Sequence, residues 1–267
     1  MDFDWAVDPL CGIESDSAAG RSLLRPAALS LFRPQAVLWE HGGCKPLGTL
    51  GGQNSYAYAI NNHGQIVGWS ETSDGSESYH AFLFEEGKMI DLGTLGGSFS
   101  IAYSINDLGQ IVGESKDPTA INHAFLWERG RMYDLGTLGG LHSCALHINA
   151  NGFIVGHSMT YNLESHAFLY AHGQIYDLSS PTEQDERAVT ITDAGMIYCF
   201  GREQGIGRID AADALSFHLK QRHSLPYTRQ DTYNLEIYSG NSRGVLVGKR
   251  ITTQGYYNEE AILLSPP

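Results

Sequence analysis

Short runs of alternating apolar and polar residues, separated by glycine-containing turns, dominate the chain. The clearest unit holds four such runs, at Tyr56–Asn61, Gln65–Ser70, His80–Glu85 and Lys88–Leu92. The turn Asn61–Gly64 separates the first two runs, and Glu86–Gly87 separates the last two. Asparagine and glycine tolerate the left-handed backbone conformation that tight hairpins need. The pattern therefore predicts short β-strands joined by hairpins, and an all-β fold.

Three strings of residues recur along the chain in one register. They are GTLGG, INxxGxIVG and HAFL, and each advances in steps of 45 or 43 residues. Their first residues are Gly48, Gly93 and Gly136, then Ile60, Ile105 and Ile148, and then His80, His123 and His166. Units of four strands that repeat every ~40 to 50 residues favour a β-propeller over a β-sandwich.

The alanine of HAFL extends the repeat over the whole chain. It occupies six positions at steps of 43 to 47 residues, namely Ala36, Ala81, Ala124, Ala167, Ala214 and Ala261. We therefore predict a single domain, a β-propeller of six four-stranded blades. Its units are residues 11–47, 48–92, 93–135, 136–178, 179–225 and 226–267.

The two ends of the chain are expected to complete one blade together. The last unit has three predicted strands, near Leu235–Gly240, Val245–Lys249 and Ala261–Leu264. Residues 1–10 are expected to supply the fourth through the strand Phe3–Asp8, which would close the ring and leave only short edges. If Ser17–Phe32 is helical, five blades remain.

The strings resemble the HAF repeat family of bacterial proteins. That family is named for the motif that appears here as His80-Ala81-Phe82, His123-Ala124-Phe125 and His166-Ala167-Phe168. The resemblance is strong over Ala36–Leu178 and weak elsewhere. It implies the repeat and no particular chemistry, and many members of the family are extracellular.

Composition and charge limit the partners of the chain. Hydrophobic residues make up 42% and charged residues 18%, which is typical of a globular protein. The net charge of −13 argues against nucleic acid or an anionic membrane as the main partner. Neither the residues MDFDWAVDPLCG nor any later run has the pattern of a signal peptide or a membrane span. We therefore expect a cytoplasmic protein, or one exported without a standard signal peptide.

The recurring polar residues are expected to serve the fold. Symmetry places the HAFL histidines in different blades, so each is predicted to form a hydrogen bond within its own blade and none to bind a metal. GTLGG lacks the lysine of a phosphate-binding loop and is predicted to carry the chain between blades through positive φ angles. Asp91, Asp134 and Asp177 are predicted to bind the backbone of that crossover. Four well-separated cysteines favour buried thiols over a metal site, and no cofactor is expected.

Candidate binding residues lie where the repeat varies. The loops between second and third strands are expected on the same face as the crossovers, which makes this the candidate binding face. Trp69 and Tyr161 flank these loops, where they would stack on a sugar ring. Trp69 has the alternative of packing between blades. The fourth crossover reads Pro181–Arg187, which places Glu186 and Arg187 beside His142 at the mouth of a central channel.

A second departure from the repeat is the segment Arg202–Arg229, which holds five of the seventeen basic residues. Arg202 completes the set of candidate ligand contacts. Within this segment, Asp210–His223 reads either as a strand or as a helix capped by Asp210. We favour the strand because Ala214 and Leu225 keep the spacing of Ala81 and Leu92.

The sequence favours a non-enzymatic scaffold that binds a ligand, a glycan or a protein on the loop face. The alternative is a hydrolase or lyase, directed at a glycan or a small molecule, with its site at the mouth of the central channel. Propeller glycosidases need carboxylates on different inner strands. The starts of the inner strands in the three clearest repeats carry none, which weighs against this alternative.

Overall fold

The computed structural model describes residues 34–40, 42–73, 78–179, 186–201, 205–215, 223–224, 235–240, 246–252 and 258–264, with side chains up to residue 215. These residues form antiparallel sheets, which we name A to F in chain order. Sheet A comprises β1 (Val37–Glu40) and β2 (Gly43–Pro46), and sheet F comprises β19 (Leu235–Gly240), β20 (Leu246–Thr252) and β21 (Asn258–Leu264).

Four sheets between these two have four strands each, paired in chain order. Sheet B holds β3 (Gly51–Ile60), β4 (Ile66–Thr72), β5 (Tyr79–Glu85) and β6 (Lys88–Asp91). Sheet C holds β7 (Ser100–Ile105), β8 (Ile111–Lys116), β9 (Asn122–Glu128) and β10 (Arg131–Asp134). Sheet D holds β11 (Gly139–Ile148), β12 (Ile154–Thr160), β13 (Ser165–Ala171) and β14 (Gln174–Asp177). Sheet E holds β15 (Glu186–Ile191), β16 (Met196–Gly201), β17 (Gly205–Asp210) and β18 (His223–Ser224).

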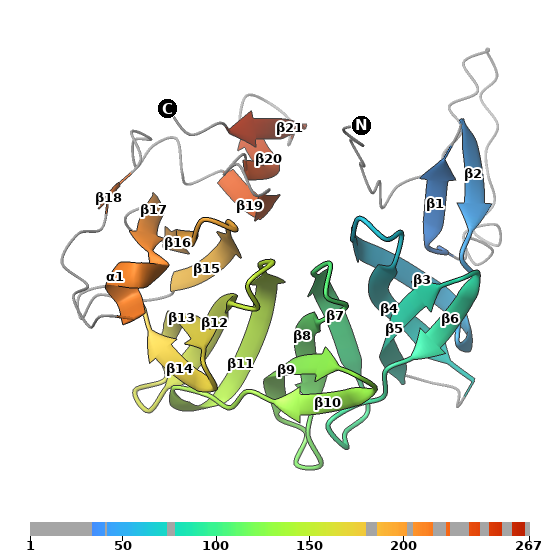
Figure 1. Ribbon diagram of the computed structural model, residues 1–267, viewed down its shortest axis with the longest axis horizontal. Coiled ribbons are helices and arrows are strands. Elements are labelled where there is room, and N and C mark those ends of the chain that lie inside the picture. The colour runs from blue at the N-terminus through green and yellow to red at the C-terminus, as the bar shows by residue number, and fades with distance from the viewer. Residues whose placement is uncertain are drawn as a thin grey trace.

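The sheets follow one another around a common centre (Figure 1). The first strand of each four-stranded sheet lies nearest this centre and the fourth lies outside. The inner strands β7, β11 and β15 each pack against strands of the preceding sheet. The prediction of an all-β fold of four-stranded units is confirmed, and the arrangement is propeller-like. The expected strand Phe3–Asp8 and the alternative helix Ser17–Phe32 lie outside the described residues.

One predicted strand is wrong. Ala214 lies in the helix α1 (Ala211–Leu215), which directly follows β17. The Asp210 carboxylate accepts a hydrogen bond from the backbone N–H of Ala212 at 2.9 Å, so it caps the helix. Ala211 and Ala214 are buried on the face that the helix turns toward sheet D. The helix capped by Asp210 therefore replaces the strand that the repeat predicts here. The alternative prediction of a helix agrees better with the structure.

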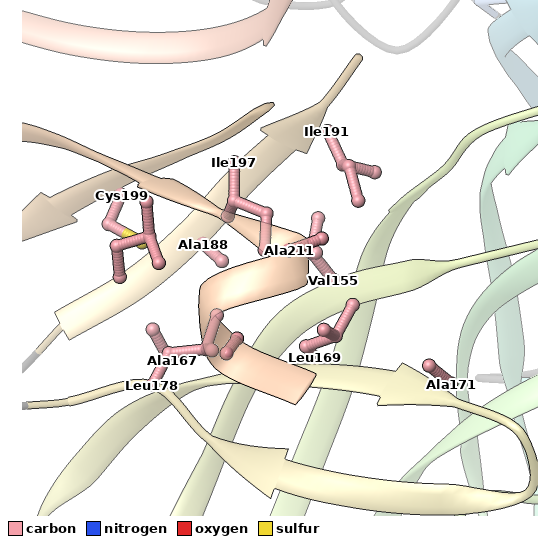
Figure 2. Close-up of a cluster of buried hydrophobic side chains, with 12 residues drawn as sticks. Val155, Ala167, Leu169, Ala171, Leu178, Ala188, Ile191, Ile197, Cys199 and Ala211 are labelled. Carbon is pink, nitrogen blue, oxygen red and sulfur yellow. The ribbon is translucent and has the colours of Figure 1, made fainter. Parts of the chain in front are cut away.

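Apolar side chains fill the space between neighbouring sheets. Figure 2 shows the cluster between sheets D and E, where Val155, Ala167 and Leu169 from one sheet face Ala188 and Ile197 from the other. All five side chains are fully buried. Alternation along the strands explains the cluster, because every second residue points toward a neighbouring sheet.

Hydrogen bonds between sheets explain why the Asn-x-x-Gly turns recur. The side chain of Asn61 donates to the backbone carbonyl of Asn106 at 3.1 Å, and Asn106 donates in the same way to Asn149 at 3.1 Å. Asn149 donates to the carbonyl of Thr192 at 3.0 Å. The turns thus join sheets B, C, D and E at one end of the inner strands, and each buried amide has a partner.

A buried serine performs the equivalent role at the opposite end of the inner strands. In sheet C, Ser100 accepts the backbone N–H of Ala81 at 2.8 Å and donates to the carbonyl of Gly93 at 2.5 Å. Ser143 repeats both bonds with Ala124 and Gly136 at 2.9 and 2.6 Å. Each serine therefore ties a crossover to the HAFL strand of the preceding sheet.

The crossover predictions are confirmed. Gly93 and Gly96 of the GTLGG string adopt φ angles of +73° and +110°, which side chains rarely tolerate. The Asp91 carboxylate accepts the backbone N–H of Gly93 at 2.7 Å, as Asp134 does from Gly136 at 2.7 Å. Hydrogen bonds from His80 and Gly93 outweigh the effect of burial and lower the pKa of Asp91.

The HAFL histidines form the predicted hydrogen bonds within their own sheets. The Nδ1 atoms of His80, His123 and His166 lie 2.9, 2.7 and 2.8 Å from carboxylate oxygens of Asp91, Asp134 and Asp177. Each pair joins the third strand to the fourth. Among the described residues, no group of three or more histidine, cysteine, aspartate or glutamate side chains is placed to hold a metal ion.

Replacing His123 by glutamine is expected to lower the free energy of unfolding by about 1 kcal/mol, because one partly exposed hydrogen bond between β9 and β10 is lost or bent. Urea unfolding of both proteins measures the difference. A metal content that falls in the variant, determined by elemental analysis of the purified proteins, would contradict this structural role.

Candidate functional site

Aromatic rings line the space between sheets B and C. The rings of Tyr56 and Trp69 stack with centroids 4.6 Å apart, and Trp69 lies 5.0 Å from Tyr79. Tyr79 in turn stacks on Phe99 of sheet C at 5.0 Å. These four residues and the pair Tyr58–Tyr103, whose centroids are 5.5 Å apart, are called the aromatic run below.

The position of Trp69 follows from strand pairing. Trp69 lies directly opposite Tyr56 on one side and Ala81 on the other, so its side chain points toward sheet C. Its indole N–H donates to the hydroxyl of Tyr58 at 3.2 Å. Trp69 therefore packs between two neighbouring sheets, which was one of the two predicted alternatives for this residue. The exposed ring of the run is Tyr58, of which 46% is accessible.

A carboxylate lies at the Tyr103 end of the aromatic run. Glu114 Oε1 accepts a hydrogen bond from the Tyr103 hydroxyl at 2.8 Å, and Oε2 accepts one from the Asn122 side chain at 3.0 Å. Burial and the nearby Glu114 charge together raise the pKa of both Tyr103 and Tyr79. The tyrosine hydroxyls therefore stay protonated, and that of Tyr103 remains a donor toward the carboxylate.

His142 joins this arrangement from sheet D. Its Nδ1 atom accepts the backbone N–H of Asn122 at 3.3 Å, so the proton of the neutral ring lies on Nε2. Asn122 thus contacts both His142 and Glu114. We call Tyr103, Glu114, Asn122 and His142 the Glu114 network. Of the predicted site residues, Trp69 and His142 do not contact each other; a series of contacts through the aromatic run and this network connects them.

Sequence reasoning missed Tyr58, Tyr103 and Glu114 because it considered carboxylates only at the starts of the inner strands and aromatic residues only beside the variable loops. A signal was present in the second strands. Comparison of the repeats shows that the position of Trp69 is taken by Glu114, His157 and Phe200 in the next three units. A serine follows this position in the units of Trp69, Glu114 and His157. A position that changes chemistry inside an otherwise strict repeat is a candidate for binding.

Tyr161 lies apart from this site. It is 86% exposed in the loop between β12 and β13, and its ring lies over Gly139 of the same sheet. Leu141 in β11 and Leu163 in the same loop as Tyr161 are also exposed, by 54% and 69%. Among the described ring contacts and hydrogen bonds, none joins Tyr161 to Trp69 or Glu114.

Glu186 is not on an exposed loop, so this part of the prediction is wrong. It is the first residue of β15 and only 2% exposed. It occupies the place of the inter-sheet serines Ser100 and Ser143, and Gly201 stands opposite it where those repeats have a second serine. The Ser179 hydroxyl donates to Glu186 Oε2 at 3.0 Å. Burial raises the pKa of Glu186 to about 7.

Arg187 lies next to Glu186 on β15, and its guanidinium carbon is 5.7 Å from the centroid of the Phe200 ring. Its charge adds to the effect of burial, which lowers the pKa of His157 to about 4. Arg187 faces the side of sheet E opposite to Glu186, because neighbouring strand residues alternate. Arg202 lies outside the described residues.

The buried cross-strand pair Cys144 and His157 is poorly suited to nucleophilic catalysis. Burial raises the pKa of the Cys144 thiol, and the Glu114 charge adds to this effect. Burial also keeps His157 neutral at pH 7. A catalytic cysteine needs a lowered pKa and an adjacent base.

Fold and repeat together define a propeller-like, all-β repeat protein. No family model and no curated protein matches the sequence. Among solved structures, the chain is similar to TolB from Acinetobacter baumannii, with a TM-score of 0.54 and 13% identity over 76% of this chain and 53% of that one. It is similar also to a puromycin hydrolase, with a TM-score of 0.50 and 14% identity over 82% of this chain and 38% of that one.

These likenesses concern the fold alone, because both identities are low. The chain spans about half the length of the TolB structure and less of the puromycin hydrolase. Within the part of the chain that the structure describes, no helix is long and apolar enough to cross a membrane.

Proposed function

We propose that the protein is a non-enzymatic scaffold of the HAF repeat type that binds a ligand through the aromatic run and the Glu114 network. In this proposal the ring has six blades and the strand Phe3–Asp8 completes sheet F. The ligand is a small molecule, or a group carried on a glycan or a protein. The net charge of −13 argues against nucleic acid or an anionic membrane as the main partner.

One observation carries this proposal. The exposed Tyr58 contacts the ring of Tyr103, and the Tyr103 hydroxyl donates to Glu114, a carboxylate that also accepts a hydrogen bond from Asn122. Binding sites commonly combine aromatic surface with a few fixed polar groups on a stable scaffold. The hydrogen-bonded asparagines and serines supply that scaffold and recur in several sheets, whereas Glu114 and Asn122 stand at positions where the neighbouring repeats have other residues.

A binding screen with matched variants tests the proposal. A library of monosaccharides, oligosaccharides, amines and amino acids is screened by thermal shift, and hits are remeasured by isothermal titration. We expect Tyr58→Leu and Glu114→Gln each to weaken a true ligand at least ~10-fold, since a hot-spot contact is removed. Tyr161→Ala, a change on the exposed edge of sheet D, serves as the control and should bind normally.

Two outcomes would count against this site. Hits that bind equally well to Tyr58→Leu and Glu114→Gln would place the ligand elsewhere on the protein. A library without any saturable hit would remove the binding proposal itself.

A further inference from the structure

We propose that this site selects an organic cation, a primary or quaternary ammonium group, over a neutral sugar or an anion. The inference rests on the proposed function and specifies the chemistry of its ligand. It follows from ring geometry, from the charge of Glu114 and from a lysine that already occupies one end of the aromatic run.

Two tyrosine rings meet at an angle and form a corner near the carboxylate. Tyr58 and Tyr103 are inclined by 45° with centroids 5.5 Å apart, and Tyr58 is nearly half exposed. The faces of aromatic rings carry partial negative charge, so a cation is attracted to them within ~6 Å of the centroid. The Tyr103 hydroxyl contacts Glu114, which places the carboxylate at the edge of this corner.

The charge of Glu114 has no basic counterpart in the described structure. Both of its hydrogen-bond donors, Tyr103 and Asn122, are neutral, and the ion pairs among the described residues all involve histidines elsewhere. The pKa values of Tyr79 and Tyr103 rise partly because this negative charge is near. A cationic ligand would supply the missing positive charge, whereas an anion would be repelled.

The chain's own lysine shows that rings of this run accept a cation. The Nζ atom of Lys116 lies 4.7 Å from the centroid of the Phe99 ring, and Phe99 stacks on Tyr79. Lys116 occupies the crossover end of the run. The Tyr58–Tyr103 corner at the other end has the same ring chemistry and, in addition, the carboxylate.

The available hydrogen-bonding groups also disfavour a neutral sugar. Sugar hydroxyls are recognised by several fixed donors and acceptors. At this corner the Tyr103 hydroxyl and the Asn122 amide already donate to Glu114, and the Trp69 N–H already donates to Tyr58. The ring surface and the negative charge of Glu114 suit an alkylammonium group.

The test compares choline with its uncharged isostere, 3,3-dimethyl-1-butanol, on the full chain. The indole N–H signal of Trp69, assigned with Trp69→Phe, is followed by ¹H–¹⁵N NMR. We expect choline to shift this signal saturably and to bind at least ~10-fold more tightly than the isostere. Glu114→Gln should weaken choline at least ~10-fold, and so should Tyr58→Leu, whereas Tyr58→Phe keeps the ring and most of the affinity.

Two further arms complete the design. Glu128→Gln, which removes a carboxylate that contacts Gln110 instead, is the matched control and should bind choline normally. A trimethyllysine peptide and its unmethylated form distinguish a protein-borne ammonium group from a free small molecule: tighter binding of either peptide than of choline indicates a protein partner.

Equal shifts from choline and its isostere, or none from either, would overturn the cation inference. If a neutral methyl glycoside then bound and lost affinity in Tyr58→Leu, the proposed binding function would stand while this inference failed. If no probe or library compound bound at all, both would fail.

Discussion

Replacing Phe125 by alanine is expected to lower the free energy of unfolding by about 4 kcal/mol, because a fully buried ring is lost from between two sheets. Phe125 lies on β9 and packs in one cluster with Val67, Ala81 and Leu83 of sheet B. Its ring also fills the space above Gly113, where an added Cβ would lie 2.9 Å from the ring. Little can move in to fill the cavity, so the loss should be near the upper part of the usual range.

Urea unfolding followed by circular dichroism measures this loss at equilibrium. Leu108→Ala provides the control, because Leu108 is 73% exposed in a turn and its truncation should change stability by less than ~0.5 kcal/mol. A change below ~1 kcal/mol for Phe125→Ala, with an unaltered slope of the unfolding curve, would mean that sheets B and C do not pack as described.

Local sequence signals predicted most of the sheets. Alternation of apolar and polar residues locates strands, and the turn residues Asn61–Gly64 and Glu86–Gly87 fix their ends, since both depend only on neighbours in the chain. Because the strings recur in the next two units, the same strands are predicted for sheets C and D. Predicted strands at Tyr56–Asn61 and His80–Glu85 correspond to β3 and β5 within a few residues.

The fourth unit was harder to predict because it departs from the repeat at several paired positions. In sheets B to D a small glycine on the second strand lies opposite a phenylalanine on the third, as Gly113 does opposite Phe125. In sheet E the equivalent pair is Cys199 and Gly207, so both the glycine and the phenylalanine of the other sheets are replaced. The alignment of the fourth unit with the repeat depends on contacts between residues that are distant in the sequence.

The candidate site was predicted in part for a related reason. Trp69 and His142 stood out as single residues, whereas the role of Glu114 depends on Asn122 from β9 and Tyr103 from β7. Contacts between neighbouring sheets determine whether a residue that the sequence pattern predicts to be exposed is in fact buried. Glu186 illustrates this best: read as a loop residue, it is enclosed because it stands in the place of an inter-sheet serine.

Glu186 is expected to make the stability of the protein fall as the pH rises toward 8. Its pKa is about 7 in the folded protein, mainly through burial, against an ordinary value of 4.5. A carboxyl whose pKa is raised on folding stabilises the native state while it is protonated, and this contribution is present in full below pH ~4.5. It is lost as the pH rises through 7, when the buried group must ionise. A shift of this size corresponds to roughly 3 kcal/mol.

Glu186→Gln removes the titration but keeps the shape and an oxygen that can accept the Ser179 hydroxyl. The stability of the variant relative to the wild type should therefore increase by roughly 3 kcal/mol between pH 4 and pH 8, as measured by urea unfolding at several pH values. Glu128→Gln is the control, and its difference from the wild type should stay nearly constant over the same range. A flat difference for Glu186→Gln as well would show that Glu186 ionises at its ordinary pKa, and hence that water reaches the seam between sheets D and E.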